Sequence, residues 1–299
     1  MSALISSFSS STNKSTTGRS RRDPRVPPSW MRGGIGALET ASPEAAGRAL
    51  AHLFFRTTRL PEREANAKVM GLASRGSLRF EGESVAVWSW GRGPAVLLAH
   101  GWNGRASQLS GFVEPLLRRD RRVVAFDHVG HGESTGNETN LLQMARATRA
   151  VADYAGGVDG LVAHSLGAAS SLFAHTEGLA VQRAALIASP ISPEPWLGYM
   201  AKIFGVGEKT VAVTRERIER RVGARMDELY LPDYASDVDA RILLVHDRDD
   251  HEVAIRTSET LHAALPGSEI VRTEGLGHNR ILRTPEVLER VAEFVTAAS

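Results

Sequence analysis

Three residue types that together can transfer an acyl group occur along this chain in the order serine, acid, histidine. Ser165 follows a short apolar run, and three aspartates lie between positions 247 and 250. His278 comes later, directly after the tripeptide Gly-Leu-Gly. A serine hydroxyl becomes a useful nucleophile when a histidine takes its proton and a carboxylate orients that histidine. The order of these residues therefore suggests covalent catalysis on Ser165.

Ser165 lies at a predicted sharp bend between a strand and a helix. The residues two positions before and after it, Ala163 and Gly167, are both small. Larger side chains would collide at such a bend. The bend would expose the hydroxyl and place the Leu166 N–H beside it, at the positive end of a helix. On this stretch alone, a serine that only caps the helix is an equally good interpretation.

The apolar pattern around these residues predicts alternating strands and helices. Continuous apolar runs such as residues 95–99 are typical of strands buried on both faces. The fold class is therefore α/β, with a mostly parallel central sheet, helices on both faces, and functional groups at the carboxyl ends of the strands. Strands are predicted at 84–90, 95–99, 122–126, 160–163, 184–188, 241–245 and 269–272, and helices at 42–57, just after Pro61, and at 105–119, 140–156, 166–176, 254–264 and 285–297.

Residues 190–240 interrupt this alternation and predict a small helical lid insertion. Two interpretations of its apolar helical face remain open: it packs the lid onto the body, or it lines a substrate pocket through Trp196, Tyr199 and Phe204. A basic helix follows, which could favour an anionic substrate, but the i, i+4 spacing of Glu216 and Arg220 favours an ordinary solvated face. The apolar face consists of Trp196, Tyr199, Met200, Ile203 and Phe204.

The composition sets further limits. The 299 residues are 42% hydrophobic and 23% charged, as in an ordinary globular protein, and none is cysteine, which excludes disulfides and thiolate chemistry. No apolar run could span a membrane or act as a secretory signal, so we expect a cytoplasmic protein.

Residues 1–32 hold six basic residues and one acidic residue and are predicted to be a disordered basic tail, with an organelle transit peptide as the alternative. Because the basic excess lies in this tail, we expect no nucleic-acid partner for the folded part.

Four motifs, in order on this strand pattern, make the chain resemble the α/β-hydrolase superfamily from roughly residue 80 onward, so that residues 33–299 would form one such domain. It is most similar to serine esterase or lipase-like members, with an Ala-x-Ser-x-Gly elbow in which Ala163 replaces the usual first glycine. The motifs are Ala163-His164-Ser165-Leu166-Gly167, the pair His100-Gly101, the Asp-x-x-Gly-x-Gly-x-Ser run from Asp127, and Asp250 followed by Gly277-His278.

The resemblance implies catalytic roles. Ser165 would be the nucleophile and His278 the general base, with Asp250 as the acid because it lies four residues beyond His246. Asp249 is the reserve candidate for the acid, and Asp247 stands where the family usually has glycine.

The resemblance also implies an oxyanion hole formed by the backbone N–H groups of Leu166 and Trp102. The Trp102 side chain would then form a wall of the acyl pocket. His100 would have a structural role in bracing its loop.

The expected function is that of a serine hydrolase of the carboxylesterase or lipase type, acting without a cofactor on a small-molecule acyl substrate. The substrate could be an ester, thioester, lactone or amide. No pair of histidines has helical metal-ligand spacing, so no metal is expected. An acyltransferase with the same three residues and a non-catalytic binding protein of the same fold are the alternatives, and the oligomeric state is left open.

Overall fold

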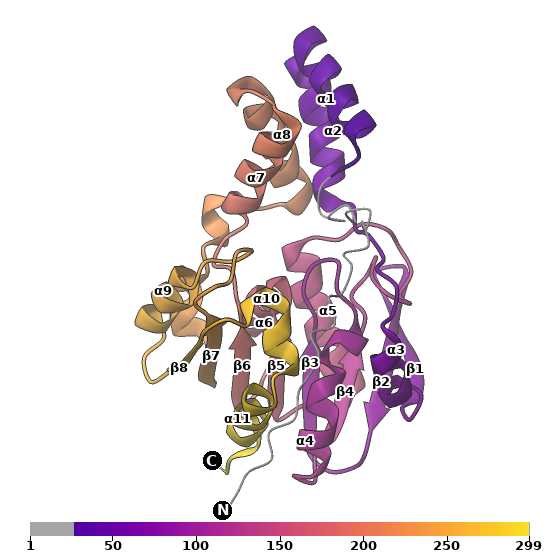
Figure 1. Cartoon of the computed structure of the whole chain (residues 1–299), viewed down its shortest axis with the longest axis vertical. Coiled ribbons are helices and arrows are strands. Elements are labelled where there is room, and N and C mark those ends of the chain that lie inside the picture. Colours follow the sequence, from indigo (N-terminus) through magenta and orange to yellow (C-terminus); the bar gives the residue numbers. More distant parts are fainter. Residues whose placement is uncertain (1–26, 299) are drawn as a thin grey trace, which may run out of the picture.

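The centre of the molecule is an eight-stranded sheet with the order β1-β2-β4-β3-β5-β6-β7-β8 (Figure 1). The computed structural model describes residues 27–298. The six strands from β3 to β8 are parallel, whereas β1 and β2 are antiparallel to their neighbours, so the predicted mostly parallel sheet is confirmed. The strands are β1 Ser74–Phe80, β2 Glu83–Trp90, β3 Ala95–Ala99, β4 Arg122–Phe126, β5 Gly160–His164, β6 Arg183–Ile187, β7 Arg241–Asp247 and β8 Glu269–Thr273.

Helices cover both faces of this sheet, which explains the continuous apolar strands. In β3, Leu97 faces one apolar core and Leu98 faces the other, because side chains alternate along a strand. The first core is covered by α5 Leu141–Tyr154, α6 Leu166–Thr176, α9 Arg256–Ala264 and the 3₁₀ segments η2 Asp227–Leu229 and η3 Leu231–Asp237; the second is covered by α3 Glu64–Met70, the 3₁₀ segment η1 Ala106–Phe112, α4 Val113–Leu117, the 3₁₀ segment η4 Ile281–Arg283 and α11 Pro285–Thr296. The short α10 Gly277–Arg280 precedes η4.

Two elements of the body differ from the sequence prediction. Strand β1 was not predicted, because it is an edge strand in which only Leu78 and Phe80 pack against the core. The single helix predicted at 105–119 is a 3₁₀ segment followed by one turn of α-helix. Gly111 and Pro115 explain this difference, since both residues weaken a continuous α-helix.

Four helices form a cap beyond the carboxyl ends of the parallel strands (Figure 1). Two of them, α7 (Glu194–Phe204) and α8 (Glu208–Val222), come from the predicted insertion. The other two, α1 (Ser29–Ala41) and α2 (Pro43–Phe55), come from the N-terminal part of the chain. The four helices share apolar clusters, such as the one formed by Ile35, Leu50, Met200 and Phe204. The cap is therefore assembled from two distant segments.

This arrangement corrects both predicted boundaries of the cap. The tail predicted to end at residue 32 overlaps α1, which begins at Ser29; residues 1–26 lie outside the described part of the chain. The glycines of α1, at 33, 34 and 36, lower its intrinsic helix propensity, so packing of Ile35 onto the cap stabilises the helix instead. At the other boundary, Leu229 and Leu231 pack in the core of the body, so the cap ends before the predicted residue 240.

The three aromatic residues predicted to line a pocket have different environments. Phe204 is buried in the apolar cluster shared by α1, α2 and α7, so its side chain packs the cap internally. This position fits the packing interpretation and corrects the pocket assignment for Phe204. Trp196 and Tyr199 stack on each other with ring centroids 5.3 Å apart, and each is 40% exposed.

Within residues 27–298, no helix combines the length and apolar character needed to cross a membrane.

Candidate active site

Ser165 occupies the bend between β5 and α6 with a strained backbone. Its φ of 55° and ψ of −128° are unusual for a residue with a side chain. Its N–H donates to the Ile187 carbonyl of the neighbouring strand at 2.8 Å, which holds the bend in place. A Cβ on Gly167 would lie 2.3 Å from the carbonyl oxygen of His100, so only glycine fits there. The methyl group of Ala163 is buried in the core, so alanine is accommodated two residues before the serine.

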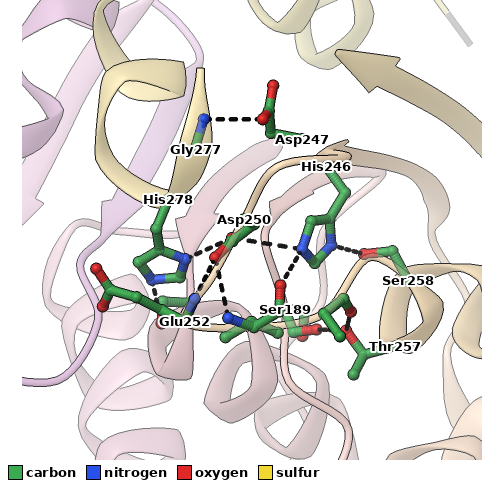
Figure 2. Close-up of polar contacts among 12 residues, drawn as sticks. Ser189, His246, Asp247, Asp250, Glu252, Thr257, Ser258, Gly277 and His278 are labelled. Atoms are coloured by element: carbon green, nitrogen blue, oxygen red, sulfur yellow. Dashed lines mark hydrogen bonds and ion pairs between the residues drawn. The ribbon is translucent and has the colours of Figure 1, made fainter. Parts of the chain in front are cut away.

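Ser165, His278 and Asp250 form a continuous chain of hydrogen bonds. Nε2 of His278 lies 3.0 Å from Oγ of Ser165. Nδ1 of His278 lies 2.7 Å from Oδ2 of Asp250 (Figure 2). This geometry fits a neutral imidazole that donates from Nδ1 to the carboxylate and accepts the serine proton on Nε2. The structure thus brings together three residues that are separated by 113 positions along the sequence.

The Asp250 carboxylate is held by several donors. Its Oδ1 accepts the N–H groups of Glu252 and Val253 at 2.8 and 2.9 Å. Its Oδ2 also lies 3.4 Å from Nε2 of His246 (Figure 2). Burial by itself would raise the pKa of Asp250, but the hydrogen bonds from His246 and His278 outweigh burial and lower the pKa below its ordinary value. Asp250 therefore remains a carboxylate that can orient His278.

Two further histidines brace this chain of hydrogen bonds. His246 is fully buried, and its Nδ1 accepts from the Ser258 hydroxyl at 2.6 Å (Figure 2). Its Nε2 donates to the Val253 carbonyl at 2.9 Å. His164 donates from Nε2 to the carbonyl of His278 at 3.0 Å. Burial and the neighbouring His278 lower the pKa of His164 to about 3, so it braces the backbone of His278 as a neutral ring. Neither role was predicted from the sequence.

Asp247 links the loop that carries Asp250 to the loop that carries His278. Its buried carboxylate accepts the N–H of Gly277 at 2.8 Å (Figure 2). It also accepts the N–H of Leu276 at 3.0 Å and the Thr273 hydroxyl at 2.7 Å. The sequence signal for this role was an aspartate at a position where the family usually has glycine.

Asp249, the reserve candidate for the acid, lies in a different environment. Its side chain is exposed and accepts the N–H of Gly275 at 2.9 Å. It therefore supports the neighbouring loop, whereas Asp250 contacts the imidazole of His278.

The loop predicted to form the oxyanion hole packs directly against the bend at Ser165. A Cβ on Gly101 would lie 2.8 Å from Cβ of Ser165, so glycine permits this close approach. The next residue is Trp102, whose ring contacts His131 edge to face. The N–H of Asn103 donates to Nε2 of His131 at 3.0 Å, and Asn103 has a positive φ of 53°. His131 thus holds the loop that carries Trp102.

The Asp-x-x-Gly-x-Gly-x-Ser run forms a tight loop around a buried carboxylate. The two oxygens of Asp127 each accept a backbone N–H at 2.6 Å, from Ala106 and Glu133. Burial raises the pKa of Asp127 despite these two donors. A Cβ on Gly132 would lie 1.9 Å from this carboxylate, which explains the glycine.

His100 braces the same region, as the resemblance implied. Its Nδ1 donates to the Gly101 carbonyl at 2.7 Å, and its Nε2 accepts the N–H of His128 at 3.0 Å. Burial lowers the pKa of His100 to about 4 and that of His131 to about 3. Across residues 27–298, no group of three or more His, Cys, Asp or Glu side chains is arranged to hold a metal ion.

The chain that leaves α2 crosses the site loops and connects them to the cap. The hydroxyl of Thr57 donates to the Gly130 carbonyl at 2.6 Å, and the N–H of Thr58 donates to the Asn103 side chain at 2.7 Å. The guanidinium of Arg59 donates to three carbonyl groups of the Asp127 loop. These supporting residues, Asn103 and Arg59 above all, carried no recognisable signal in the sequence.

The fold and this arrangement are those of an α/β hydrolase, and the comparison with known families agrees. The chain belongs to the alpha/beta hydrolase family, whose model matches residues 96–291. No curated protein sequence matches the chain.

Solved structures with a similar fold include several enzymes. The Pyrococcus furiosus esterase Pf2001 has a TM-score of 0.62 and 19% identity, covering 80% of this chain and 98% of its own. A membrane phospholipase A described as a bacterial virulence factor has a TM-score of 0.60 and 18% identity, covering 90% and 99%. Est816, an N-acyl homoserine lactone degrading enzyme, has a TM-score of 0.57 and 17% identity, covering 72% and 98%.

The link formed by Asp247 leads to a first prediction. Asp247→Ala leaves the N–H groups of Leu276 and Gly277 without their acceptor, so His278 should shift relative to Ser165. We expect activity towards a p-nitrophenyl ester to fall by about 10²-fold, which is the loss of rate that a displacement of a reacting group by about 1 Å can cause. Asp249→Ala, which removes an exposed neighbouring carboxylate, is the matched control and should change activity less than threefold. Equal losses in both variants would contradict the positioning role of Asp247.

The buried histidines lead to a second prediction. Unfolded histidines bind protons near pH 6.5, whereas folded His100 and His131 do so only near pH 4 and 3. The unfolded state thus binds more protons between these values, and stability should fall as the pH decreases from about 6.5. Each such histidine adds about 1.4 kcal/mol per pH unit to this slope.

Urea unfolding between pH 6.5 and 4.5 measures this slope. His131→Gln should reduce the slope by the contribution of one histidine, about 1.4 kcal/mol per pH unit. This reduction is expected whatever the variant does to stability at neutral pH. The exposed Leu72 provides the control, since Leu72→Gln neither adds nor removes a titratable group and should leave the slope unchanged. A wild-type stability that is independent of pH in this range would contradict the prediction.

Proposed function

We propose that this protein is a serine hydrolase that cleaves a carboxylic ester or a related acyl bond through an acyl-enzyme on Ser165. The observation that carries the proposal is the chain of hydrogen bonds from Ser165 through His278 to the buried Asp250. The arrangement supplies a nucleophile, a general base and a group that orients the base.

In the first half of the reaction, Oγ of Ser165 attacks the acyl carbon and its proton passes to Nε2 of His278. The imidazolium formed in this step is stabilised by the Asp250 carboxylate 2.7 Å from Nδ1. His278 then gives the proton to the leaving group as the bond between the acyl carbon and that group breaks. The acyl group is left esterified to Ser165.

The negative charge on the acyl oxygen requires hydrogen-bond donors. The N–H of Leu166, at the start of α6, and the N–H of Trp102 are the proposed donors. Two features support this assignment: Gly101 packs against Ser165, and Asn103 is anchored to His131. Both contacts hold the donor loop next to the nucleophile, so little reorganisation is needed when the charge develops.

The second half of the reaction repeats these steps with water. His278 takes a proton from a water molecule as its oxygen attacks the acyl carbon, and returns the proton to Oγ of Ser165 as the ester bond breaks. The products are a carboxylic acid and the free enzyme.

The acyl substrate is supported by the fold neighbours and by an aromatic pair on the cap. An esterase, a phospholipase A and an N-acyl homoserine lactone degrading enzyme have similar folds. On the cap of this chain, Trp196 and Tyr199 form a stacked and partly exposed pair, which suits contact with an apolar acyl or alcohol group.

Labelling with a fluorophosphonate tests the nucleophile. Wild-type protein should be labelled and should hydrolyse p-nitrophenyl esters, because activated serine attacks both reagents. Ser165→Ala should not be labelled, and its kcat/KM should fall by at least about 10⁴-fold. In Asp250→Asn, kcat/KM should fall by about 10³-fold or more while the protein stays folded, whereas Asp249→Asn should remain active. Undiminished labelling of Ser165→Ala would overturn the proposal.

The aromatic pair is tested by chain-length preference. Trp196→Ala removes partly exposed aromatic surface, so we expect a shift in the preferred acyl length and a loss of stability below about 1 kcal/mol. Phe204→Ala is the comparison variant. It opens a cavity in the cap core and should cost about 3 kcal/mol while the preference stays the same. An unchanged preference in Trp196→Ala would mean that the pair does not contact the substrate.

A further inference from the structure

A basic groove lies between α2 and α8 in the cap, and the proposed hydrolysis does not use it. Its volume is about 290 Å³. One wall comes from the N-terminal segment and the other from the insertion, so the groove exists only when the cap is assembled. Five of the seven side chains that line it are basic or histidine: Arg48, His52, Arg217, Arg220 and Arg221, with Ala51 and Phe55 as the apolar remainder.

The acidic residues around this groove neutralise only part of its charge. Arg220 pairs with Glu216 one turn earlier on α8, and Arg221 pairs with Glu138 of the body. His52 also faces Glu138, at 3.2 Å. Neither of the other two guanidinium groups, those of Arg48 and Arg217, forms a salt bridge or hydrogen bond with another residue of the described range 27–298.

The bottom of the groove is formed by packed apolar residues. Ala51 and Phe55 are both buried, and they pack with Ile218 of α8. The guanidinium of Arg221 lies over the Phe55 ring at 4.3 Å from its centroid and holds its ion pair with Glu138 at the same time. One cationic side chain of the groove is thus already ordered before any ligand binds, which lowers the entropy cost of binding.

We propose that this groove binds a small phosphate compound that carries at least two negative charges, such as a phosphate monoester or pyrophosphate. Arg48 and Arg217, which have no acidic partner among the described residues 27–298, lie on facing helices and together match two negative charges. Their planar guanidinium groups suit bidentate contact with phosphate oxygens. A volume of about 290 Å³ holds a phosphate group and a short organic remainder. A soluble compound is favoured over a phospholipid, because a volume of about 290 Å³ is too small for acyl chains.

A bound phosphate compound would connect the two halves of the cap. Arg48 belongs to α2 and Arg217 to α8, so contact with both joins the N-terminal segment to the insertion. The same region contacts the body, because Glu138 of the body forms an ion pair with Arg221 of α8. The backbone of Glu138 also forms an isolated β-bridge with Arg56, just after α2. Binding should therefore stabilise the cap and its attachment to the body. This effect is independent of the chemistry proposed at Ser165.

The test is calorimetric titration and thermal unfolding of the full chain with inorganic pyrophosphate, at constant ionic strength set with sodium chloride. Wild-type protein should bind pyrophosphate saturably, and its unfolding midpoint should rise by roughly 3 °C at saturation. The double variant Arg48→Gln/Arg217→Gln should bind at least tenfold more weakly and lose the thermal shift. The double variant Arg79→Gln/Arg92→Gln removes two exposed arginines elsewhere and should behave like the wild type.

The outcomes separate the possible sources of phosphate. Phosphatidylcholine vesicles with and without phosphatidic acid form a second arm, and we expect no binding to either. Binding to the phosphatidic acid vesicles without a response to pyrophosphate would overturn the proposal in favour of a lipid surface. An equal pyrophosphate response in both double variants, or none in the wild type, would also overturn it. Fluorophosphonate labelling of each protein reports separately on Ser165.

Discussion

The close approach of two backbone segments at Ser165 is the constraint on which the site depends. The bend holds Ser165 in a left-handed conformation, and neighbouring strands and loops must fit around it without side chains in the way. Gly167 meets the carbonyl of His100, and Gly101 meets Ser165 itself, at distances that exclude a Cβ. Ala163 is tolerated because its methyl group points into the core. A buried sheet and two glycines therefore place the proposed nucleophile next to its proposed oxyanion donors.

Around this bend, buried polar side chains organise loops that lack regular structure. Three aspartates do this by accepting hydrogen bonds. Asp127 holds the loop beside the nucleophile, Asp247 joins two loops, and Asp250 accepts a hydrogen bond from His278. The neutral rings of His131 and His164 also hold loops: His131 accepts the N–H of Asn103, and His164 donates to the carbonyl of His278. Because an unpaired buried polar group is costly, each network specifies one loop conformation.

The cap follows a different principle, since apolar packing between distant segments holds it together. Helices α1 and α2 contribute Ile35 and Leu50, and α7 contributes Met200 and Phe204, to a shared cluster. The segment that follows α2 then contacts the site loops through Thr58 and Arg59. The N-terminal segment is thus connected both to the cap and to the loop that carries Trp102. A ligand that bridges α2 and α8 would act at this connection.

The sequence by itself determined the α/β class and most strands and helices, and it was enough to propose Ser165, Asp250 and His278 as site residues, because apolar periodicity and short motifs are local properties. It did not predict β1 or α1, whose exposed or glycine-rich sequences depend on neighbours for their stability. Only the tertiary structure decided that Phe204 packs the cap and that Asp247 links two loops. These facts depend on contacts between segments far apart in the chain, and local patterns carry no information about which segments meet.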